Sequence, residues 1–265
     1  MPEMITSVQN DKIKELYKLL RNRKFREESG LFVLEGATLA REAVLSENTI
    51  HSAFCTDLAE KNYPEAVHAV WKKAKNTYIV QEHIPEKLSD QKVPQGIFVV
   101  VEYPKENTKA VLGNRVLILD GIQDPGNLGA IARSALAFGF DTLILSQNTV
   151  DAYSPKSQRA AMGALLRCRI IDGNITKDAV QMLRDNGFCI IAAAVGEDSL
   201  LVNNVVLSGK MALLIGSEAH GVSLDILKCC DSSVMIPMDC RTESLNAAVA
   251  AGIIMWEIRS QDGAK

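Results

Sequence analysis

Three polar segments in the second half of the sequence carry residue types that a ligand site needs, and each directly follows an apolar run. Glycine permits close backbone approach to a ligand, while Arg, Glu, Ser and Asn supply charge and hydrogen bonds. In open α/β sheets, ligands bind at the carboxyl ends of the strands. We therefore expect one site made from GIQDPGNLGAIARSA at 121–135, GSEAHGVS at 216–223 and IPMDCRTESLN at 236–246.

The usual nucleotide-binding and hydrolase motifs are absent. No GxGxxG follows a predicted strand, and neither GxxxxGK[ST] nor GxSxG occurs. A dinucleotide-dependent dehydrogenase, a P-loop phosphotransferase and an α/β-hydrolase would each need one of these motifs. The sequence therefore disfavours these three classes, and also a Rossmann methyltransferase with a glycine-rich loop after its first strand.

The elements around the three segments indicate a parallel sheet. Five short apolar runs, RVLILD, TLILS, FCIIAAAV, MALLIG and SVMIPM, have the composition of strands buried on both faces. Helical segments separate them, and the last one, LNAAVAAGIIMWEIR, is rich in alanine and almost uncharged. We predict a domain at 115–265 with at least five parallel strands and helices on both sides.

The first hundred residues predict a smaller α/β domain. The apolar runs LFVLEG, IHSAFC, TYIV and GIFVVVE alternate with helical segments such as ATLAREAVLS and YPEAVHAVWKKAK. We place this domain at 1–102. Residues 103–114, YPKENTKAVLGN, mix Pro, Gly, Asn and charges without an apolar period, as expected of a linker.

A one-signed charge cluster lies near the start of the chain, on a helix predicted over 11–23. Residues 12–26 contain seven basic side chains, one acid and Phe25. A solvated helix face and a contact with nucleic-acid phosphates both explain such a cluster. For the second reading, the candidate RNA-binding residues are Lys18, Arg21, Arg23 and Lys24.

Composition sets the remaining bounds. The chain has 265 residues, 47% hydrophobic content, 23% charged content and a net charge of −3, so nucleic-acid binding would require a local basic patch. No signal peptide or membrane span is expected. The six cysteines form no CxxC pair and have no histidine at metal-ligand spacing. Most are expected to be buried thiols, in a cytoplasmic protein without a metal.

The three segments, in this order, resemble the motifs of the SpoU (TrmH) family of RNA 2′-O-ribose methyltransferases, in the SPOUT superfamily. The likeness covers 115–259, and ITSVQNDKIKELYKLL with FVLEGATLAREAV resembles the substrate-binding domain that often precedes it. The resemblance implies an α/β fold with a deep trefoil knot in the parallel-sheet SPOUT domain and a smaller, L30e-like N-terminal domain. It also implies a homodimer, an RNA substrate and S-adenosylmethionine as cofactor.

The resemblance assigns roles residue by residue. Asn127 and Arg133 match the first motif, and Pro237 lies within the third. The implied cofactor-binding residues are Gly216, Ser217, Gly221, Ile236, Met238 and Leu245. The implied catalytic residues are Asn127, Arg133, Glu218, Ser244 and Asn246.

The chemistry implied is attack by a ribose 2′-hydroxyl on the sulfonium methyl, which mainly requires alignment and removal of a proton. Because the pKa of arginine exceeds about 12, we expect Arg133 to bind a neighbouring phosphate and orient the hydroxyl. Glu218 would orient Arg133 or its loop, and Ser244 and Asn246 would hold the ribose or the arginine.

Simpler structural roles compete with these assignments. Asn127 would also serve as a helix cap before LGAIARSA, and either Ser244 or Asn246 would cap the last helix. Cys240 stands where the family usually has glycine, so a side chain would narrow the cofactor loop. The N-terminal domain favours ribosomal RNA over transfer RNA as substrate, and a non-catalytic RNA-binding protein is the alternative from another class.

Overall fold

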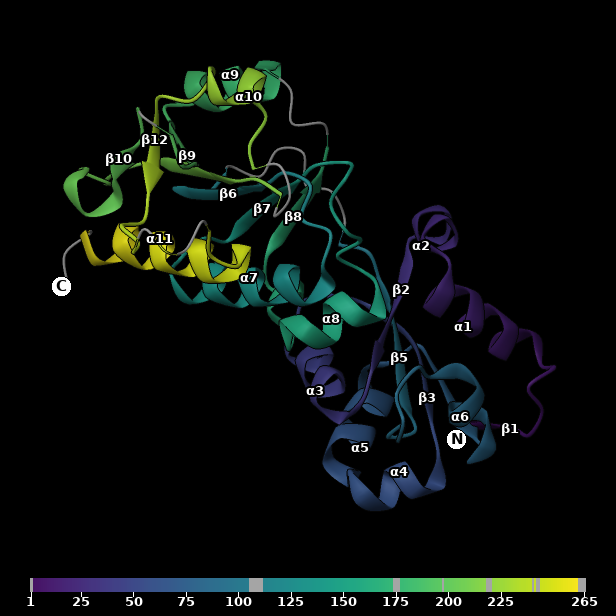
Figure 1. Ribbon diagram of the computed structural model, residues 1–265. Coiled ribbons are helices and arrows are strands. Elements are labelled where there is room, and N and C mark those ends of the chain that lie inside the picture. Colours follow the sequence, from purple (N-terminus) through teal and green to yellow (C-terminus); the bar gives the residue numbers. More distant parts are fainter. Residues whose placement is uncertain are drawn as a thin grey trace. The chain divides into compact units, whose positions relative to one another are not determined.

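The structure, a computed structural model, describes residues 2–104, 112–173, 177–196, 198–217, 221–239, 241 and 244–261, without the side chain of residue 178. The chain forms two compact units (Figure 1). Unit 1 comprises Met1–Thr108 together with Asp151–Leu166, and unit 2 comprises Lys109–Val150 and Arg167–Lys265. The class predicted from the sequence, α/β in both parts of the chain, is confirmed.

Unit 1 is built on a five-stranded mixed sheet. The strands lie in the order β1-β4-β3-β5-β2, with β1, β4 and β3 mutually parallel and β5 antiparallel to both of its neighbours. The four apolar runs of the sequence supply the longer strands, and only the three-residue β1 lacks such a run. The bounds are β1 Glu3–Ile5, β2 Leu31–Glu35, β3 Ile50–Cys55, β4 Asn76–Val80 and β5 Ile97–Glu102.

Helices cover this sheet because they bury apolar residues at helical spacing. In α1, the residues Ile13, Leu16 and Leu20 pack into a core with strand residues such as Val33 and Phe54. Helices α3 and α5 pack against each other and against β5 and β3. The bounds are α1 Asp11–Arg21, α2 Arg23–Ser29, α3 Ala37–Leu45, α4 Asp57–Asn62, α5 Pro64–Lys73 and α6 His83–Leu88.

A segment from the middle of the chain, Asp151–Leu166, completes unit 1. It contains α8 (Pro155–Ala161) and the 3₁₀ turn η1 (Ala164–Leu166), and α8 packs against β2. Asp151 accepts hydrogen bonds from the guanidinium of Arg26, whose side chain is 4% exposed. The rings of Tyr153 and Tyr103 stack with centroids 4.1 Å apart. This segment lies within the domain predicted at 115–265, whereas α8 packs against β2 of unit 1.

Unit 2 contains a seven-stranded, fully parallel sheet in the order β10-β12-β9-β11-β6-β7-β8. The five apolar runs form five of these strands. The sheet also contains two strands that were not predicted, β8 and the two-residue β10. The bounds are β6 Arg115–Leu119, β7 Thr142–Leu145, β8 Arg169–Asp172, β9 Cys189–Ala193, β10 Leu200–Leu201, β11 Met211–Ile215 and β12 Ser232–Met235.

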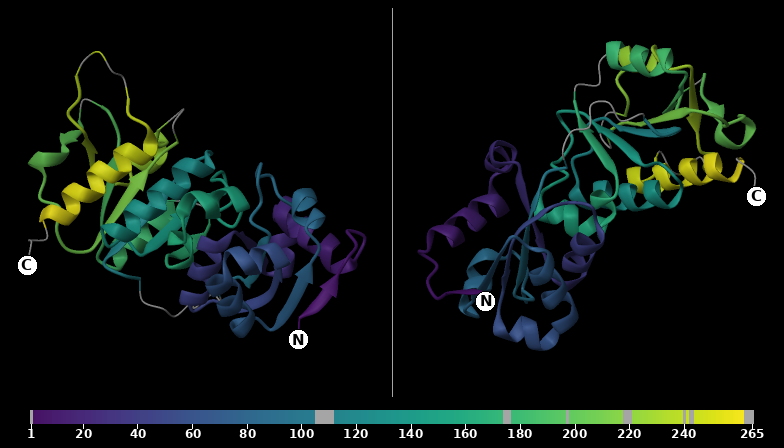
Figure 2. Two further views of the ribbon diagram at one scale, coloured as in Figure 1. Left: turned by 90° about the horizontal axis from the view of Figure 1, so that it is seen from below. Right: turned by 180° about the vertical axis from the view of Figure 1, so that it is seen from behind.

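Two helical layers enclose this sheet, as Figures 1 and 2 show. Helices α7 (Pro125–Ala137) and α11 (Ala247–Gln261) pack along each other on one face. Helices α9 (Lys177–Asp185) and α10 (Leu224–Leu227) lie on the other, where Val180, Leu183 and Ile226 join the core. The short turn η2 (Val202–Asn204) also contacts α11. No helix in the described part of the chain is long and apolar enough to span a membrane.

The cysteines only partly follow the expectation that they are buried. Cys55 and Cys168 are buried, but Cys189, at the start of β9, is exposed. Burial raises the pKa of both buried thiols to about 12. Among the residues that the structure describes, no three His, Cys, Asp or Glu side chains are grouped as a metal site would require.

The raised pKa of Cys55 makes unit 1 less stable in alkali. Between about pH 9 and pH 12 the unfolded thiol loses its proton while the folded thiol keeps it, so the free energy of unfolding falls as pH rises. We expect Cys55→Ala to remove about 1 kcal/mol of this fall between pH 8 and pH 10. Urea titrations of both proteins at each pH measure it, and equal pH dependence would contradict the expectation.

Candidate functional site

A cavity of about 350 Å³ lies in unit 2 at the carboxyl ends of three adjacent strands, β12, β9 and β11. This is the position at which open parallel sheets bind ligands, and the volume is within the usual range for small-molecule sites. All of its described lining side chains are uncharged. The lining includes seven residues proposed from the sequence: Gly216, Ser217, Gly221, Ile236, Met238, Ser244 and Leu245.

Two glycines shape the segment after β11. Gly216 lies so close to the next turn that a Cβ on it would be 2.1 Å from the carbonyl carbon of Gly221 and 2.4 Å from the nitrogen of Val222. Gly221 has φ +64° and donates its N–H to the carbonyl of Ser217. Glycine is therefore required at position 216 because the backbone of Gly221 and Val222 comes close to it, and not because a ligand does, as the sequence suggested.

The segment after β6 lies beside the same turn. A Cβ on Gly121 would be 3.3 Å from the Cβ of Ser217, so the first and second polar segments touch. The Gly121 N–H donates to Ser146 Oγ at 2.9 Å and to Thr149 Oγ1 at 3.2 Å. This contact fixes the first segment against the loop that follows β7.

Of the two helix caps predicted from the sequence, the one on α11 is observed and the one on α7 is not. Asp124, not Asn127, caps α7, because its Oδ1 accepts the N–H of Asn127 at 2.8 Å. Asn246 caps α11, accepting the N–H of Ala248 at 2.9 Å. Asn127 is therefore left with another role: its Oδ1 accepts from Asn246 Nδ2 at 2.9 Å and joins the first segment to the third.

Two proposed catalytic residues, Arg133 and Glu218, are not among the described residues that line the cavity. Arg133, on α7, is exposed and is not part of the cavity lining. Glu218 and Cys240 lie outside the described residues. Next to that last position, the exposed side chain of Arg241 hydrogen-bonds the Asp239 carboxylate and lowers the pKa of that carboxyl.

Sequence reasoning missed the part of the cavity that β9 and α11 supply. Ala193 is the last residue of β9, Ala194 and Val195 follow it directly, and Ala250 and Ile254 come from α11. A signal for the first group was present, since the apolar run of β9 ends in a polar GED, as the runs of β6 and β11 end in polar segments. The alanines of α11 carried no such signal, because small residues also suit plain helix packing.

Most of the basic charge on α1 and α2 is paired. Arg23 Nε is 2.7 Å from Glu27 Oε1, and Lys24 Nζ is 3.7 Å from Glu28 Oε1. The acids are outside the 12–26 stretch, which is why the sequence shows an excess of positive charge there. The other pairs of this kind are Lys12 with Glu3, Lys14 with Asp11 and Arg26 with Asp151.

Lys18 and Arg21 differ from these five residues. In the part of the chain that the structure describes, neither has a carboxylate partner. The Lys18 ammonium lies 5.5 Å from the centroid of the Phe25 ring, and the Arg21 guanidinium carbon lies 5.7 Å from the centroid of the Tyr17 ring. These two cations remain available to an anionic partner.

Comparison with known protein families and sequences gives consistent matches over nearly the whole chain. Residues 114–256 match the model of the SpoU rRNA Methylase family, and residues 10–99 match the MRM3-like substrate binding domain. The 23S rRNA (guanosine(2553)-2′-O)-methyltransferase RlmP of Bacillus subtilis (strain 168) is 30% identical over 257 residues, which cover 97% of this chain and 99% of the relative.

Solved structures agree in fold. The AdoMet-bound rRNA methyltransferase from Sinorhizobium meliloti superposes with a TM-score of 0.86 at 26% identity, covering 97% of each chain. The SpoU methyltransferase AviRb from Streptomyces viridochromogenes has a TM-score of 0.82 at 26% identity and covers 95% of this chain and 97% of its own. Both likenesses extend over unit 1 as well as unit 2.

Proposed function

The chain belongs to the SpoU rRNA methylase family, and on this premise we propose that it methylates a ribose 2′-hydroxyl of ribosomal RNA with S-adenosylmethionine. The observation that carries the proposal is the cavity at the ends of β9, β11 and β12. It is lined by all six residues that the motifs assign to the cofactor: Gly216, Ser217, Gly221, Ile236, Met238 and Leu245.

The cavity suits S-adenosylmethionine on chemical grounds. Apolar side chains such as Ile215, Leu245 and Ile254 offer walls for an adenine ring, and backbone groups near Gly216 offer polar contacts. No cationic side chain occurs in the described lining, so a positively charged sulfonium would meet no repulsion there. When bound, the cofactor supplies an electrophilic methyl group on sulfur.

The protein's own part in the reaction is to position the ribose. We propose that Arg133 holds a phosphate next to the target nucleotide through its planar fork of N–H donors and so orients the 2′-hydroxyl. Ser244 contributes a hydroxyl at the cavity. The Asn127–Asn246 hydrogen bond keeps the segments that carry these groups together. Glu218 is proposed to orient Arg133.

A homodimer would complete this site. Val249, Ile253 and Trp256 are spaced i, i+4 and i+7 on α11 and are exposed by 50%, 38% and 57%. Such an apolar stripe on the surface is typical of an interface. Because Arg133 lies on α7, which packs along α11, and is exposed in the single chain, we propose that it acts in the dimer. The trefoil knot stays a prediction.

Trp256→Glu is expected to give a monomer. The substitution places a charge in the apolar stripe, and a buried interface Trp commonly contributes about 2 kcal/mol or more, which corresponds to about 30-fold in the dimer dissociation constant. Analytical ultracentrifugation measures it. Met182→Glu, at an equally exposed apolar position on α9, serves as the matched control and should remain dimeric. A monomeric wild type, or a dimeric Trp256→Glu, would refute the interface.

Ribosomal RNA is the substrate that the comparisons favour. The curated relative is named for 23S rRNA, and this chain carries a match to a substrate-binding domain at residues 10–99. Neither a transfer RNA enzyme nor a non-catalytic RNA-binding protein gains comparable support. We propose residues 1–102, together with Asp151–Leu166, as the RNA substrate-binding domain, 103–114 as the linker and the rest of 115–265 as the methyltransferase domain. We propose the cytoplasm as the place of action.

The decisive experiment measures cofactor binding and methyl transfer in sequence. The purified protein is titrated calorimetrically with S-adenosylmethionine and then incubated with tritiated cofactor and unmodified 23S rRNA. Binding followed by labelled ribose supports the proposal, and mapping the label identifies the nucleotide. If the cofactor does not bind, the proposed function is wrong. If it binds and only transfer RNA is labelled, the substrate class is wrong.

A further inference from the structure

A second cavity, of about 210 Å³, lies entirely within unit 1. It is formed where α1 and α2 approach the loop after α6 and the start of α8, the helix from the middle of the chain. Half of its lining residues carry a charge, whereas the described lining of the first cavity carries none. The charged side chains of the lining are Arg21, Arg26, Glu35, Asp90 and Lys156.

The acidic side chains of this cavity are already compensated. Glu35, whose side chain is 2% exposed, accepts from Arg159 Nη1 at 3.1 Å and from the Ser89 hydroxyl. Asp90 accepts from Arg159 Nη2 at 2.7 and 3.0 Å. A single guanidinium therefore bridges both carboxylates, which leaves little negative charge to attract a cation.

Two cations at the same cavity lack such compensation. Within the described residues, Arg21 makes one long hydrogen bond, 3.4 Å from its Nη2 to the carbonyl of Leu88, and otherwise lies against the Tyr17 ring. In the part of the chain that the structure describes, the exposed Lys156 has no hydrogen-bond or ion-pair partner. The buried Arg26, by contrast, is held by Asp151 and by the carbonyl of Leu19. The available charge at this cavity is thus positive and complementary to an anion.

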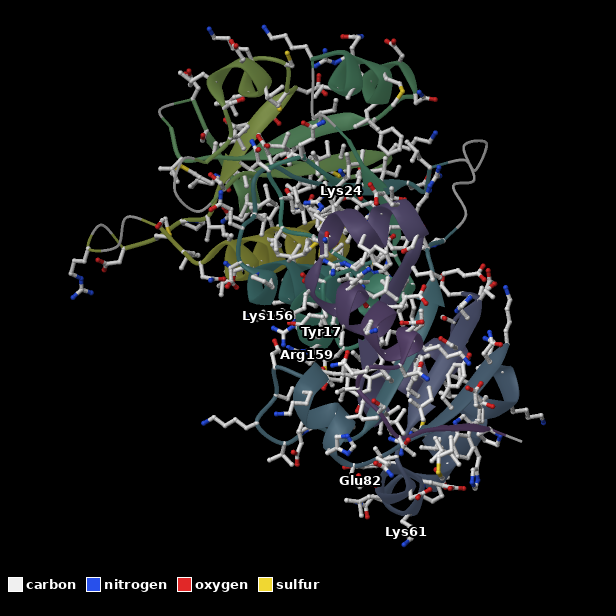
Figure 3. All side chains as sticks on the ribbon, turned by 90° about the vertical axis from the view of Figure 1, so that its right-hand side faces the viewer. Tyr17, Lys24, Lys61, Glu82, Lys156 and Arg159 are labelled. Atoms are coloured by element: carbon white, nitrogen blue, oxygen red, sulfur yellow. The ribbon has the colours of Figure 1, made fainter. Side chains whose placement is uncertain are left out.

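The surface beside the cavity indicates that the anion belongs to a nucleic acid. Tyr17 is 48% exposed and precedes Lys18, and both lie within one turn of Arg21 on α1. An exposed aromatic ring among unpaired cations is the combination that binds unpaired nucleotides, with the ring stacking on a base and the cations contacting phosphates. Figure 3 shows Tyr17 and Lys156 on the same side of unit 1 and Lys61 away from them.

We propose that Lys156, together with Lys18 and Arg21, forms a phosphate-binding subsite for an unpaired segment of the substrate RNA, with Tyr17 stacking on a neighbouring base. The proposal rests on the proposed function, because it assigns a second contact for the same RNA. It separates Arg23 and Lys24, which are paired with Glu27 and Glu28, from the cations that bind phosphate. It also gives a segment from the catalytic half of the sequence a part in RNA binding.

The test measures the affinity of the full-length protein for unmodified 23S rRNA as a function of salt. Lys156→Ala is expected to weaken binding about three- to tenfold at low salt and to reduce the slope of log K against log salt by about 0.7 to 0.9, the loss of one phosphate contact. Lys61→Ala, on α4, is the matched control and should leave the slope unchanged.

A residue-level readout accompanies the affinities. Saturating RNA should protect Lys156 from acetylation in the wild type while Lys61 stays reactive, as mass spectrometry of the digested protein would show. An unchanged salt slope for Lys156→Ala, or equal acetylation with and without RNA, overturns the subsite. Protection by inorganic phosphate but not by RNA assigns the site to a free anion and likewise overturns it. Failure of methyl transfer by the wild type would instead refute the proposed function.

Discussion

Arg133→Ala abolishes methyl transfer and leaves S-adenosylmethionine binding intact if the proposed mechanism holds. The guanidinium would fix the phosphate next to the target ribose, and loss of such positioning commonly costs 10²-fold or more in rate. Cofactor affinity should stay within about twofold, because Arg133 is not part of the cavity lining. Tritiated transfer to 23S rRNA and calorimetry with S-adenosylmethionine measure the two quantities separately.

Two further variants make this result specific. Arg133→Lys keeps the charge but not the planar fork of donors, so it should recover only a small part of the activity. Arg41→Ala, at an exposed arginine on α3 in unit 1, is the matched control and should transfer methyl groups at the wild-type rate. Transfer near the wild-type rate by Arg133→Ala would show that the residue is structural.

Gly216→Ala should abolish cofactor binding. The added Cβ would lie 2.1 to 2.4 Å from backbone atoms of Gly221 and Val222, a separation at which one segment of backbone must move. Both segments line or flank the cavity, so we expect S-adenosylmethionine affinity to fall more than 100-fold and methyl transfer to vanish. Calorimetry measures the first effect and tritium transfer the second.

Gly173→Ala is the matched control, because nothing lies within 4 Å of a Cβ at that glycine. It should bind the cofactor as the wild type does. Retained RNA binding and an unchanged circular dichroism spectrum would show that Gly216→Ala is folded and that the effect is local. Near-normal cofactor affinity in Gly216→Ala would mean that the turn adapts and that the cavity does not depend on this close approach.

The sequence predicted the main elements of both units because most strands are continuous apolar runs. It missed elements that lack this signature. The strand β8 reads RIID and ends in a charged residue, and β10 has only two residues. The helix α2, RKFREES, carries a single large apolar side chain, Phe25, so no helical period was visible.

The sequence predicted which residues belong to the site better than it predicted which of them contact each other. The motif spacing identified seven of the residues that line the cavity, since the segments that carry them follow strand ends. The pairing of Asn127 with Asn246 joins positions far apart in the sequence, and the charges of Arg23 and Lys24 are cancelled by acids just outside the basic stretch. Local patterns carry no information about such partners. The capping role of Asp124, by contrast, is indicated by the DPGN sequence, in which proline follows the capping residue at the first position of the helix.

The membership of Asp151–Leu166 in unit 1 has a consequence for synthesis on the ribosome. At a synthesis rate of about 5–20 residues per second, residue 166 is made several seconds after residue 108. Unit 1 therefore lacks its last helix, α8, while β6 and β7 are being made. During that interval Arg26 has no Asp151 to neutralise it, and the Tyr103 ring lacks its stacking partner Tyr153. The nascent chain should therefore be most vulnerable to proteases and most in need of chaperones at this stage.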